Sequence, residues 1–563
     1  FSVICLSAIA QGGKDSSVPL FFEKAWLHTD RDIYGQGEDI WFKTYVVNAQ
    51  DNTPVNYSHN LYVELIGPQA RLVKRETIRL EDGLGNGDFK LSDTISPGRY
   101  RIRAYTNWMR NFGDNFVFEK YVTILQTSGI SADISKNKPA AGKKNKGANT
   151  VSVSISSLPV VRFYPEGGTM VTGIRGTIGV KAEDASGKGI AANGSIQNNM
   201  GQNIAAFSCD SLGFGSFTLQ PQAGQYYQAL VMIKGREQRF ILPEVQASGF
   251  GLGISYLNAD TVKAIISAYP ATLGGHLQLV ARHGGKSYVR QGVTLNKNNA
   301  ITAIPSNRLP EGITAITLYN EQGQPQCERL IYIHHPGNKD NVIISTNKKG
   351  YQPKQQVTVS IRTLPHANLS LAAVDVDAAP VQPENIASYF NLQSEIRGTV
   401  EQPCRYFDTT NVNRFKQLDE LLLTQGWRNF VWRRLEDTTL RLNYDVETGI
   451  TLTGKVIKQW SKKPLPNMNI TVFAPKAITQ KLFTTITDTL GKFTVYGADF
   501  FGYQFISFNS IKNNGKDGGR ISVDSLYQDT LKIEPAKSFI PAIRIQNSDS
   551  LSGRRPTKKF TFN

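Results

Sequence analysis

Short stretches of alternating apolar and polar residues recur along most of the chain. In Asp39–Val47 and Asn60–Ile66 the apolar residues fall mainly at every second position, the period of a strand with one buried face. Turn-forming pairs such as Pro97-Gly98 separate these stretches. Within residues 20–126 we expect seven strands: Lys24–His28, Asp39–Val47, Asn60–Ile66, Leu72–Leu80, Gly87–Leu91, Arg99–Trp108 and Phe116–Leu125.

Strands of this length and spacing predict an antiparallel sandwich of the immunoglobulin-like kind. Alternation through the sixth expected strand places Tyr100 and Ile102 in the core. The same alternation predicts that Arg99, Arg101 and Arg103 face outward.

The stretch Thr29–Val47 returns as Thr346–Thr363, more than 300 residues later. Both copies have Thr, then Tyr five residues on, then apolar residues six and eight positions beyond the Tyr. In the second copy Lys354 and Gln355 stand where the first has Gly37 and Glu38. A signature repeated at this distance predicts a string of related β-modules.

The rest of the chain divides by composition and turn spacing into further modules. Glu384–Arg397 and Arg414–Leu423 are expected to be helical, with Phe415, Leu418 and Leu422 on one apolar face. We interpret them as a helical insertion packed on a sandwich, the alternative being a docking face for a partner. The expected limits are: signal-peptide remnant and leader 1–19, sandwich 20–126, flexible basic linker 127–157, sandwiches 158–245 and 246–338, fourth sandwich 339–447, last sandwich 448–530 and tail 531–563. The helical insertion is expected near residues 384–435, within the fourth sandwich.

The repeated stretch resembles the start of a macroglobulin-type domain, as in alpha-2-macroglobulins and complement-like proteins. The residues that carry the resemblance are Thr29, Asp30, Tyr34, Gly37, Glu38 and Ile40. Three further stretches look like Bacteroidota cell-envelope proteins that combine macroglobulin-type domains with a carboxypeptidase-regulatory-like domain: Phe163–Gly173, Leu309–Ile333 and Leu418–Trp432.

Residues 448–530 look like that carboxypeptidase-regulatory-like domain, through Gly454-Lys455-Val456 and the hairpin residues Asp488 and Gly491–Phe493. The resemblance implies a transthyretin-like sandwich without peptidase activity. The expected fold class is therefore all-β, with tandem immunoglobulin-like (macroglobulin-type) sandwiches, a small helical insertion and a C-terminal transthyretin-like sandwich.

The net charge of +17 is spread over the chain, and its densest run is Lys136–Lys146 with five lysines. This run is interpreted as a solvated linker, with contact to an anionic membrane surface or glycan as the alternative. Nucleic-acid binding is not expected, because no recognition motif accompanies the charge. Trp41, Trp108 and Trp460 are interpreted as core residues, with a glycan platform as the alternative.

The first residues, Phe1–Gln11, are apolar and contain Ala8-Ile9-Ala10, which fits the end of a secretory signal peptide. Because Ile4 precedes Cys5, a lipoprotein signal is not favoured. We expect secretion across an inner membrane to the periplasm or outer membrane, with no transmembrane helix. Three cysteines remain, so at most one disulfide can form, of unknown pairing: Cys209, Cys327 and Cys404.

No stretch of the sequence carries a recognisable catalytic, cofactor or metal motif. None of these cysteines lies in the C-G-E-Q thioester motif of opsonic macroglobulins. His334 and His335 are adjacent on an expected strand and point to opposite faces. Asp82–Asp93 matches a calcium loop only in part, and a hairpin turn explains it better. Asp375 and Asp377 are interpreted as strand-end residues, with paired acid–base carboxylates as the alternative.

The sequence therefore leads us to expect no catalytic, cofactor-binding or metal-binding residues and no enzymatic activity. The leading hypothesis is a cell-envelope binding or scaffold protein associated with an outer-membrane complex that resembles a TonB-dependent receptor. The alternative is a macroglobulin-like endopeptidase inhibitor without a thioester, with residues 131–150 as the exposed bait segment.

Overall fold

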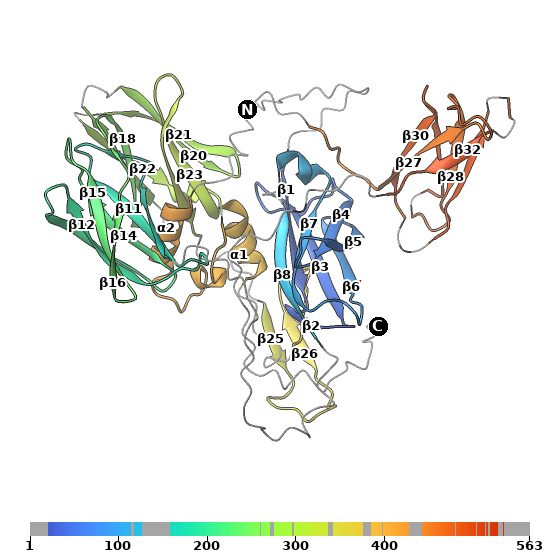
Figure 1. Ribbon diagram of the computed structural model, residues 1–563, viewed down its shortest axis with the longest axis horizontal. Coiled ribbons are helices and arrows are strands. Elements are labelled where there is room, and N and C mark those ends of the chain that lie inside the picture. The colour runs from blue at the N-terminus through green and yellow to red at the C-terminus, as the bar shows by residue number, and fades with distance from the viewer. Residues whose placement is uncertain are drawn as a thin grey trace, which may run out of the picture. The chain divides into compact units, whose positions relative to one another are not determined.

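The computed structural model describes residues 21–526 and residue 533, with gaps at 114–116, 127–157, 259–260, 271–274, 296–297, 336–341, 375–383, 397, 427–441, 479, 501, 503, 513 and 516–517. The fold is all-β, with tandem immunoglobulin-like sandwiches and a small helical insertion, as the sequence predicts (Figure 1). The chain divides into two compact units: unit 1 contains Phe1–Val153, Val374–Phe390 and Asn429–Asn563, and unit 2 contains Ser154–Ala373 and Asn391–Arg428. The predicted leader 1–19 and linker 127–157 lie outside the described residues, as does the tail 531–563 apart from residue 533.

The first sandwich, in unit 1, confirms all seven predicted strands and adds a short one. One sheet has the order β1-β3-β6 and the other β2-β8-β7-β4-β5. The strands are β1 (Glu23–Thr29), β2 (Ile33–Gly35), β3 (Asp39–Asn48), β4 (Asn60–Ile66), β5 (Leu72–Arg79), β6 (Leu84–Lys90), β7 (Gly98–Tyr105) and β8 (Phe118–Leu125), followed after β7 by the 3₁₀ turn η1 (Trp108–Phe112). The alternating apolar residues of these strands form one core between the sheets, including Leu27, Ile40, Leu61, Val63, Phe89 and Ile102.

Arg101 and Arg103 alternate with the core residues Tyr100 and Ile102, as the outward prediction requires, but both side chains are buried rather than exposed to solvent. Arg103 pairs with Glu64 of the neighbouring strand β4, and Glu64 also accepts a hydrogen bond from Nε of Arg75 on β5 at 2.7 Å. Arg101 pairs with Glu119 on β8 at 3.1 Å. Charged residues on one sheet face therefore bury one another, which the sequence alternation of a single strand cannot reveal.

The second sandwich lies in unit 2 and consists of sheets ordered β14-β11-β9 and β13-β12-β15-β16, with the parallel pair β10-β17 beside them. Its strands are β9 (Val160–Pro165), β10 (Met170–Val171), β11 (Gly176–Glu183), β12 (Ala192–Asn198), β13 (Asn203–Cys209), β14 (Phe214–Leu219), β15 (Tyr227–Ile233), β16 (Arg236–Ile241) and β17 (Val245–Gln246). Its core includes Phe163, Ile178, Val180, Ile196 and Val231.

The third sandwich, also in unit 2, pairs a sheet β18-β19-β22 with a sheet β21-β20-β23-β24. Its strands are β18 (Gly249–Asn258), β19 (Thr261–Tyr269), β20 (His276–His283), β21 (Lys286–Thr294), β22 (Asn299–Pro305), β23 (Gly312–Tyr319) and β24 (Pro325–Ile333), with the 3₁₀ turn η4 (Ser306–Arg308). Leu252, Ile266, Leu279 and Ile331 lie in its core.

The predicted helical insertion is confirmed as α1 (Ile386–Asn391) and α2 (Arg414–Gln425), with 3₁₀ turns η5 (Gln393–Glu395) and η6 (Pro403–Tyr406). Leu418, Leu421 and Leu422 of α2 are buried in a cluster with residues of β14, β23 and β24 in unit 2. Phe415, predicted on the same buried face, is instead half exposed. α2 thus packs on the second and third sandwiches, whereas the sequence led us to expect packing on the fourth.

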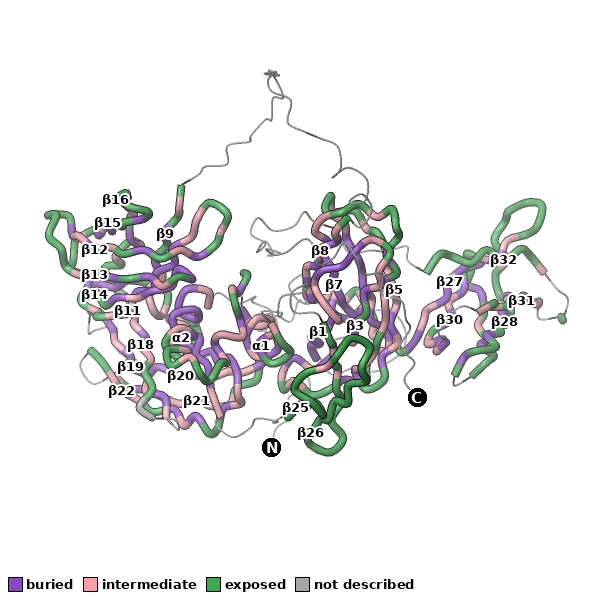
Figure 2. The backbone as a smooth tube through the Cα atoms, turned by 90° about the horizontal axis from the view of Figure 1, so that it is seen from below, coloured by how far each residue is buried: buried purple, intermediate pink, exposed green. Residues whose placement is uncertain are grey.

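Residues 342–374 contain a hairpin of two short strands, β25 (Ile343–Thr346) and β26 (Val359–Arg362). Every residue of both strands is exposed, as the tube coloured by burial shows (Figure 2). The strand predicted at Leu369–Asp375 does not form over its described residues 369–374. A packed fourth sandwich over 339–447 therefore stays a prediction, as do the other domain limits.

The last module consists of two three-stranded sheets, ordered β30-β27-β32 and β29-β28-β31. Its strands are β27 (Ile450–Ile457), β28 (Asn469–Phe473), β29 (Leu482–Ile486), β30 (Lys492–Ala498), β31 (Ser507–Ile511) and β32 (Arg520–Val523), around a core with Val456, Ile470, Val472 and Phe493.

Trp108 is buried as predicted, but Trp41 and Trp460 are exposed, so their assignment to the core is wrong.

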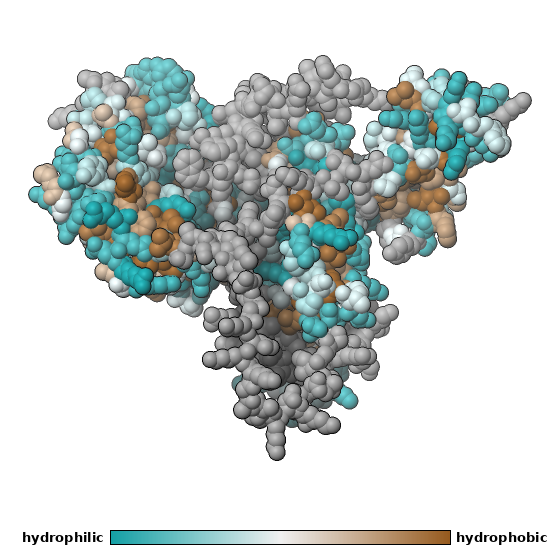
Figure 3. Space-filling view, in the orientation of Figure 1, coloured by the Kyte–Doolittle hydropathy of each residue, from teal (hydrophilic) through white to brown (hydrophobic). Residues whose placement is uncertain are grey.

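The surface of the second and third sandwiches shows apolar residues scattered among hydrophilic ones (Figure 3). Among the described residues, no helix has the length and apolar character that crossing a membrane requires.

Candidate functional site at the junction of two sandwiches

The three stretches that drew attention in the sequence meet at one buried arginine in unit 2. Arg329 comes from Leu309–Ile333, and its Nε lies 3.1 Å from Oε1 of Glu166, which belongs to Phe163–Gly173. A terminal guanidinium nitrogen of Arg329 lies 2.8 Å from Oδ1 of Asp419, which belongs to Leu418–Trp432. We call these three residues the junction triad.

The turn after β9 brings Glu166 into this position. Glu166 follows Pro165 at the strand end, and its amide donates to the Thr177 carbonyl at 2.8 Å, which keeps the backbone in the sheet. Gly167 and Gly168 then adopt positive φ angles of 81° and 111°. A Cβ on Gly167 would lie 3.3 Å from the Leu252 nitrogen of β18, so glycine lets the two sandwiches approach closely.

The triad ties together three separate parts of unit 2. Glu166 Oε1 accepts a hydrogen bond from the Ile254 amide of β18 at 3.1 Å, in addition to its pairing with Arg329 of β24. The arginine also donates to the Leu330 carbonyl at 2.9 Å. The side chains of Glu166 and Arg329 are only 6% and 4% exposed. Buried charges this well partnered hold the second sandwich, the third sandwich and α2 in a defined arrangement.

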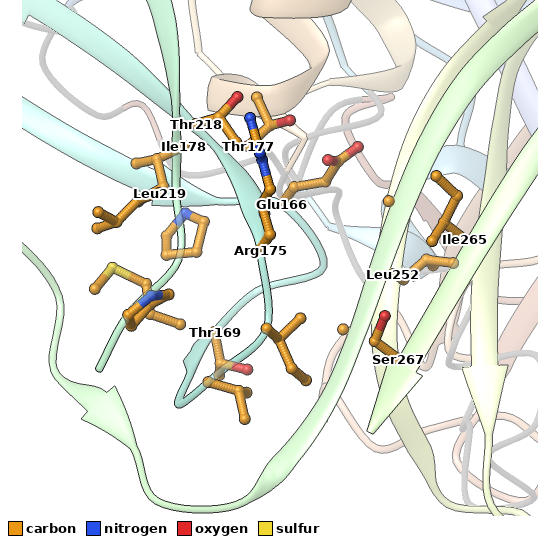
Figure 4. A pocket seen from close by; sticks show the side chains of 18 of the residues that line it. Glu166, Thr169, Arg175, Thr177, Ile178, Thr218, Leu219, Leu252, Ile265 and Ser267 are labelled. Carbon is orange, nitrogen blue, oxygen red and sulfur yellow. The ribbon is translucent and has the colours of Figure 1, made fainter. Parts of the chain in front are cut away.

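Beside the triad lies a cavity of about 310 Å³ between the second and third sandwiches. Thr169, Arg175 and Thr177 lie on one side of the cavity, and Leu252, Ile265 and Ser267 lie across from them on β18 and β19 (Figure 4). Gly251 and Gly253 of β18 contribute no side chain to the cavity wall. The lining therefore mixes aliphatic side chains with hydroxyl groups and one exposed arginine.

This arrangement offers both apolar contacts and hydrogen-bonding groups to a bound molecule. The carboxylate of the cavity, Glu166, is engaged through Oε1 by a guanidinium and a backbone amide. The hydroxyls can donate and accept hydrogen bonds, as the backbone of a bound polypeptide requires. Among the described residues, no group of three or more His, Cys, Asp or Glu side chains could hold a metal ion.

The structure also places most of the chemical candidates considered from the sequence. His334 lies 3.5 Å from Glu311, whereas a ring nitrogen of His335 contacts the Leu309 carbonyl at 2.7 Å, so the pair does not converge. Glu81 and Leu84 exchange backbone hydrogen bonds of 2.9 Å around Asp82, which confirms the hairpin turn. Asp375 and Asp377 lie outside the described residues.

Of the remaining cysteines, Cys209 and Cys327 are buried and form no disulfide, and Cys404 is partly buried. Burial raises the pKa of the Cys209 and Cys327 thiols to about 12 in each case. Neither is therefore a thiolate nucleophile at neutral pH.

The junction triad itself was missed by reasoning from the sequence. The stretches were recognised, but nothing in them states that Glu166, Arg329 and Asp419 meet. One usable signal exists: Arg329 stands within the apolar end of β24, where an unpaired charge would be strongly unfavourable.

Comparisons with known proteins match one part of the chain to a family. Residues 24–117 match the MG2 domain model. A comparison with curated proteins finds no match. The solved structure of trypsin-activated alpha-2-macroglobulin from Escherichia coli is 11% identical, with a TM-score of 0.19, over 92% of this chain and 42% of that chain.

The solved structure of dimeric latent PorU from Porphyromonas gingivalis is 10% identical, with a TM-score of 0.26, over 56% of this chain and 34% of that chain. The solved structure of surface layer protein SbsC, domains 4–9, is 10% identical, with a TM-score of 0.22, over 89% of this chain and 81% of that chain. The chain spans 26% of the Salmonella alpha-2-macroglobulin structure that it matches. TM-scores this low do not show that the whole chain is arranged like any of these proteins. The first sandwich, which contains the Thr29–Val47 motif, is thus similar to the MG2 domain family.

Proposed function

We propose that the protein is a non-catalytic binding and scaffold protein of a bacterial cell envelope, which holds an outer-membrane partner that resembles a TonB-dependent receptor. The observation that carries this proposal is the junction of the second and third sandwiches, where the junction triad lies beside an open cavity.

The triad supports a binding role because it fixes the cavity walls before any partner arrives. Both walls come from sheets held by Glu166 and Arg329, so a partner segment would be bound with little loss of conformational freedom in the protein. The volume of about 310 Å³ accommodates a few side chains of an inserted loop rather than a whole domain.

The envelope location is supported by the sequence. Phe1–Gln11 has the composition of a signal peptide, and the stretches that form the triad resemble Bacteroidota cell-envelope proteins. The match of residues 24–117 to the MG2 model is consistent with this setting.

The test is a pull-down from the native outer membrane with the chain tagged at its C-terminus, followed by mass spectrometry. Gly253→Leu fills the cavity, since a Cβ there meets its nearest neighbours at 3.8 Å, which is ordinary contact. The matched control is Gly292→Leu at an exposed position of β21, where a Cβ meets nothing within 4 Å.

We expect a stoichiometric β-barrel partner with the wild type and the control, and its loss with Gly253→Leu. Equal recovery with both variants would exclude the cavity as the binding site. Recovery of the protein alone, or with a cleaved protease bound near residues 131–150, would refute the scaffold role, and the second outcome would establish the inhibitor alternative.

A further inference from the structure

The hairpin β25–β26 reproduces the opening hairpin of the first sandwich down to individual hydrogen bonds. In the first copy the Tyr34 hydroxyl donates to Asp30 Oδ1 at 2.7 Å, and the same oxygen accepts from the Trp41 amide at 3.1 Å. In the second copy the Tyr351 hydroxyl donates to Asn347 Oδ1 at 2.6 Å, and that oxygen accepts from the Thr358 amide at 3.1 Å.

The strand register is also the same in both copies. Thr29 pairs with Phe42 between β1 and β3, and the equivalent Thr346 pairs with Val359 between β25 and β26. Even the divergent turn position is conserved in conformation, since Gly37 and Lys354 have φ angles of 78° and 66°. The repeat seen in the sequence is therefore a repeat of structure.

Burial separates the two copies sharply. Five equivalent positions form one face of each hairpin, and in the first copy they are at most 4% exposed in the sandwich core, whereas in the second they are 38–56% exposed. The buried set is Ala25, Leu27, Ile40, Phe42 and Thr44, and the exposed set is Val342, Ile344, Val357, Val359 and Ile361. The second hairpin thus presents a core face that nothing in the described chain covers.

The first copy shows which strand pairs with such a hairpin. There the edge of β3 that does not pair with β1 pairs antiparallel with β6, so that Ile40 is opposite Phe89 and Phe42 is opposite Gly87. β26 has only β25 as a neighbour among the described strands. No Gly-x-Gly-x-Phe stretch like that of β6 follows the second copy between residues 363 and 447.

Charge indicates the nature of the missing strand. The span 25–45 of the first copy has four acidic residues, Asp30, Asp32, Glu38 and Asp39, beside the basic Arg31 and Lys43. The equivalent span 342–362 has no acidic residue and four basic ones, Lys348, Lys349, Lys354 and Arg362. Two such hairpins would repel one another, which disfavours a second copy of this chain as the occupant.

We propose that the β25–β26 hairpin is an interaction surface that accepts an acidic, extended polypeptide segment of a partner as a strand along the edge of β26. The segment places apolar side chains at alternate positions on the exposed core face and carboxylates near the lysines of the turn. A small residue opposite Val359 and a large apolar one opposite Val357 reproduce the pairing of β6 on β3. The hairpin shares no residue with the cavity, so its failure as a binding surface would leave the proposed function untouched.

The test uses the full chain and a defined probe. The probe is a synthetic peptide with the sequence Leu84–Leu91 of β6 carrying the change Lys90→Glu, and the control peptide is a scramble of the same composition. Binding is measured by fluorescence anisotropy for the wild type, for Val359→Asp and for Ile241→Asp, whose exposed side chain on β16 provides the matched control.

We expect the ordered peptide to bind the wild type and the Ile241→Asp variant equally, within twofold. Val359→Asp should weaken binding at least tenfold, and added salt should weaken it for every variant. Absence of binding at about 1 mM peptide, equal binding of the scramble, or undiminished binding to Val359→Asp would each overturn the proposal.

A second measurement excludes the other occupants. Maleimide labelling of Val359→Cys in the purified chain should proceed at a rate within a few-fold of Ile241→Cys. If Val359→Cys is labelled more than tenfold more slowly than Ile241→Cys in a monomeric protein, the chain covers its own hairpin. If the same slow labelling is found in a dimeric protein, a second copy covers the hairpin. Either result overturns the proposal.

Discussion

Replacing Arg329 by methionine tests whether the junction triad holds the second and third sandwiches together. Methionine keeps much of the side-chain volume but removes the guanidinium. Glu166, 6% exposed, would then keep only the Ile254 amide as a partner, while Asp419, 39% exposed, can be solvated.

Removing one partner of a buried ion pair destabilises a protein by about 3–5 kcal/mol, because the remaining charge stays buried without compensation. The matched control is Arg162→Met, which breaks a pair with Glu183 whose arginine is 53% exposed. Exposed pairs contribute about 0–1 kcal/mol, so this control should change little.

Amide hydrogen exchange is the suitable assay, since it reports local opening of β18 and β24 separately from the other modules. The expected loss of stability in Arg329→Met corresponds to amide exchange that is faster by about 100- to 4,000-fold in β18 and β24. Adding Glu166→Gln to Arg329→Met should restore most of the protection, because the buried group is then neutral. Exchange in Arg329→Met equal to that in Arg162→Met would refute the reasoning.

Three further predictions concern stability. Burial raises the pKa of Glu23 to about 7 from the ordinary 4.5, so the folded protein binds more protons than the unfolded one between these values and loses stability as pH rises through them. The free energy of unfolding of the first sandwich, followed by urea titration, should fall by about 3 kcal/mol from pH 4 to pH 8, and Glu23→Gln should flatten this profile; an unchanged slope would contradict the assignment. Gly83→Ala places a Cβ 2.2 Å from a backbone oxygen at φ 74° and should lower the unfolding midpoint of the first sandwich well below that of Gly113→Ala, which has open space around it; equal midpoints would refute this. Leu421→Ala on α2 should destabilise unit 2 by about 2–5 kcal/mol, whereas Phe415→Ala, at a half-exposed site, should change stability by less than 1 kcal/mol, as exchange in α2 would show.

The local pattern of the sequence was enough to predict the strands of the first sandwich. Asn60–Ile66 was predicted with the limits that β4 has, because its alternation and flanking turns act within a few residues. The repeat of Thr29–Val47 at Thr346–Thr363 was likewise visible, since the side chains that close the turn are local in sequence.

Only the tertiary structure decided which of these patterns are buried. Arg103 reads as an outward residue of β7, but Glu64 on the adjacent strand buries it. Val359 matches the core residue Phe42 in the repeat and is nevertheless exposed. Burial depends on residues that are distant in the chain, and a periodic pattern says only that one face is apolar.

The candidate site depended on the fold in the same way. The sequence by itself determined that three stretches are distinctive and that the chain is a series of β-modules. That Glu166, Arg329 and Asp419 meet, across 163 and 90 residues of chain, was decided by the packing of two sandwiches and a helix. The physical reason is that an ion triad is defined by distances of about 3 Å in space, and such distances leave no periodic trace in a sequence.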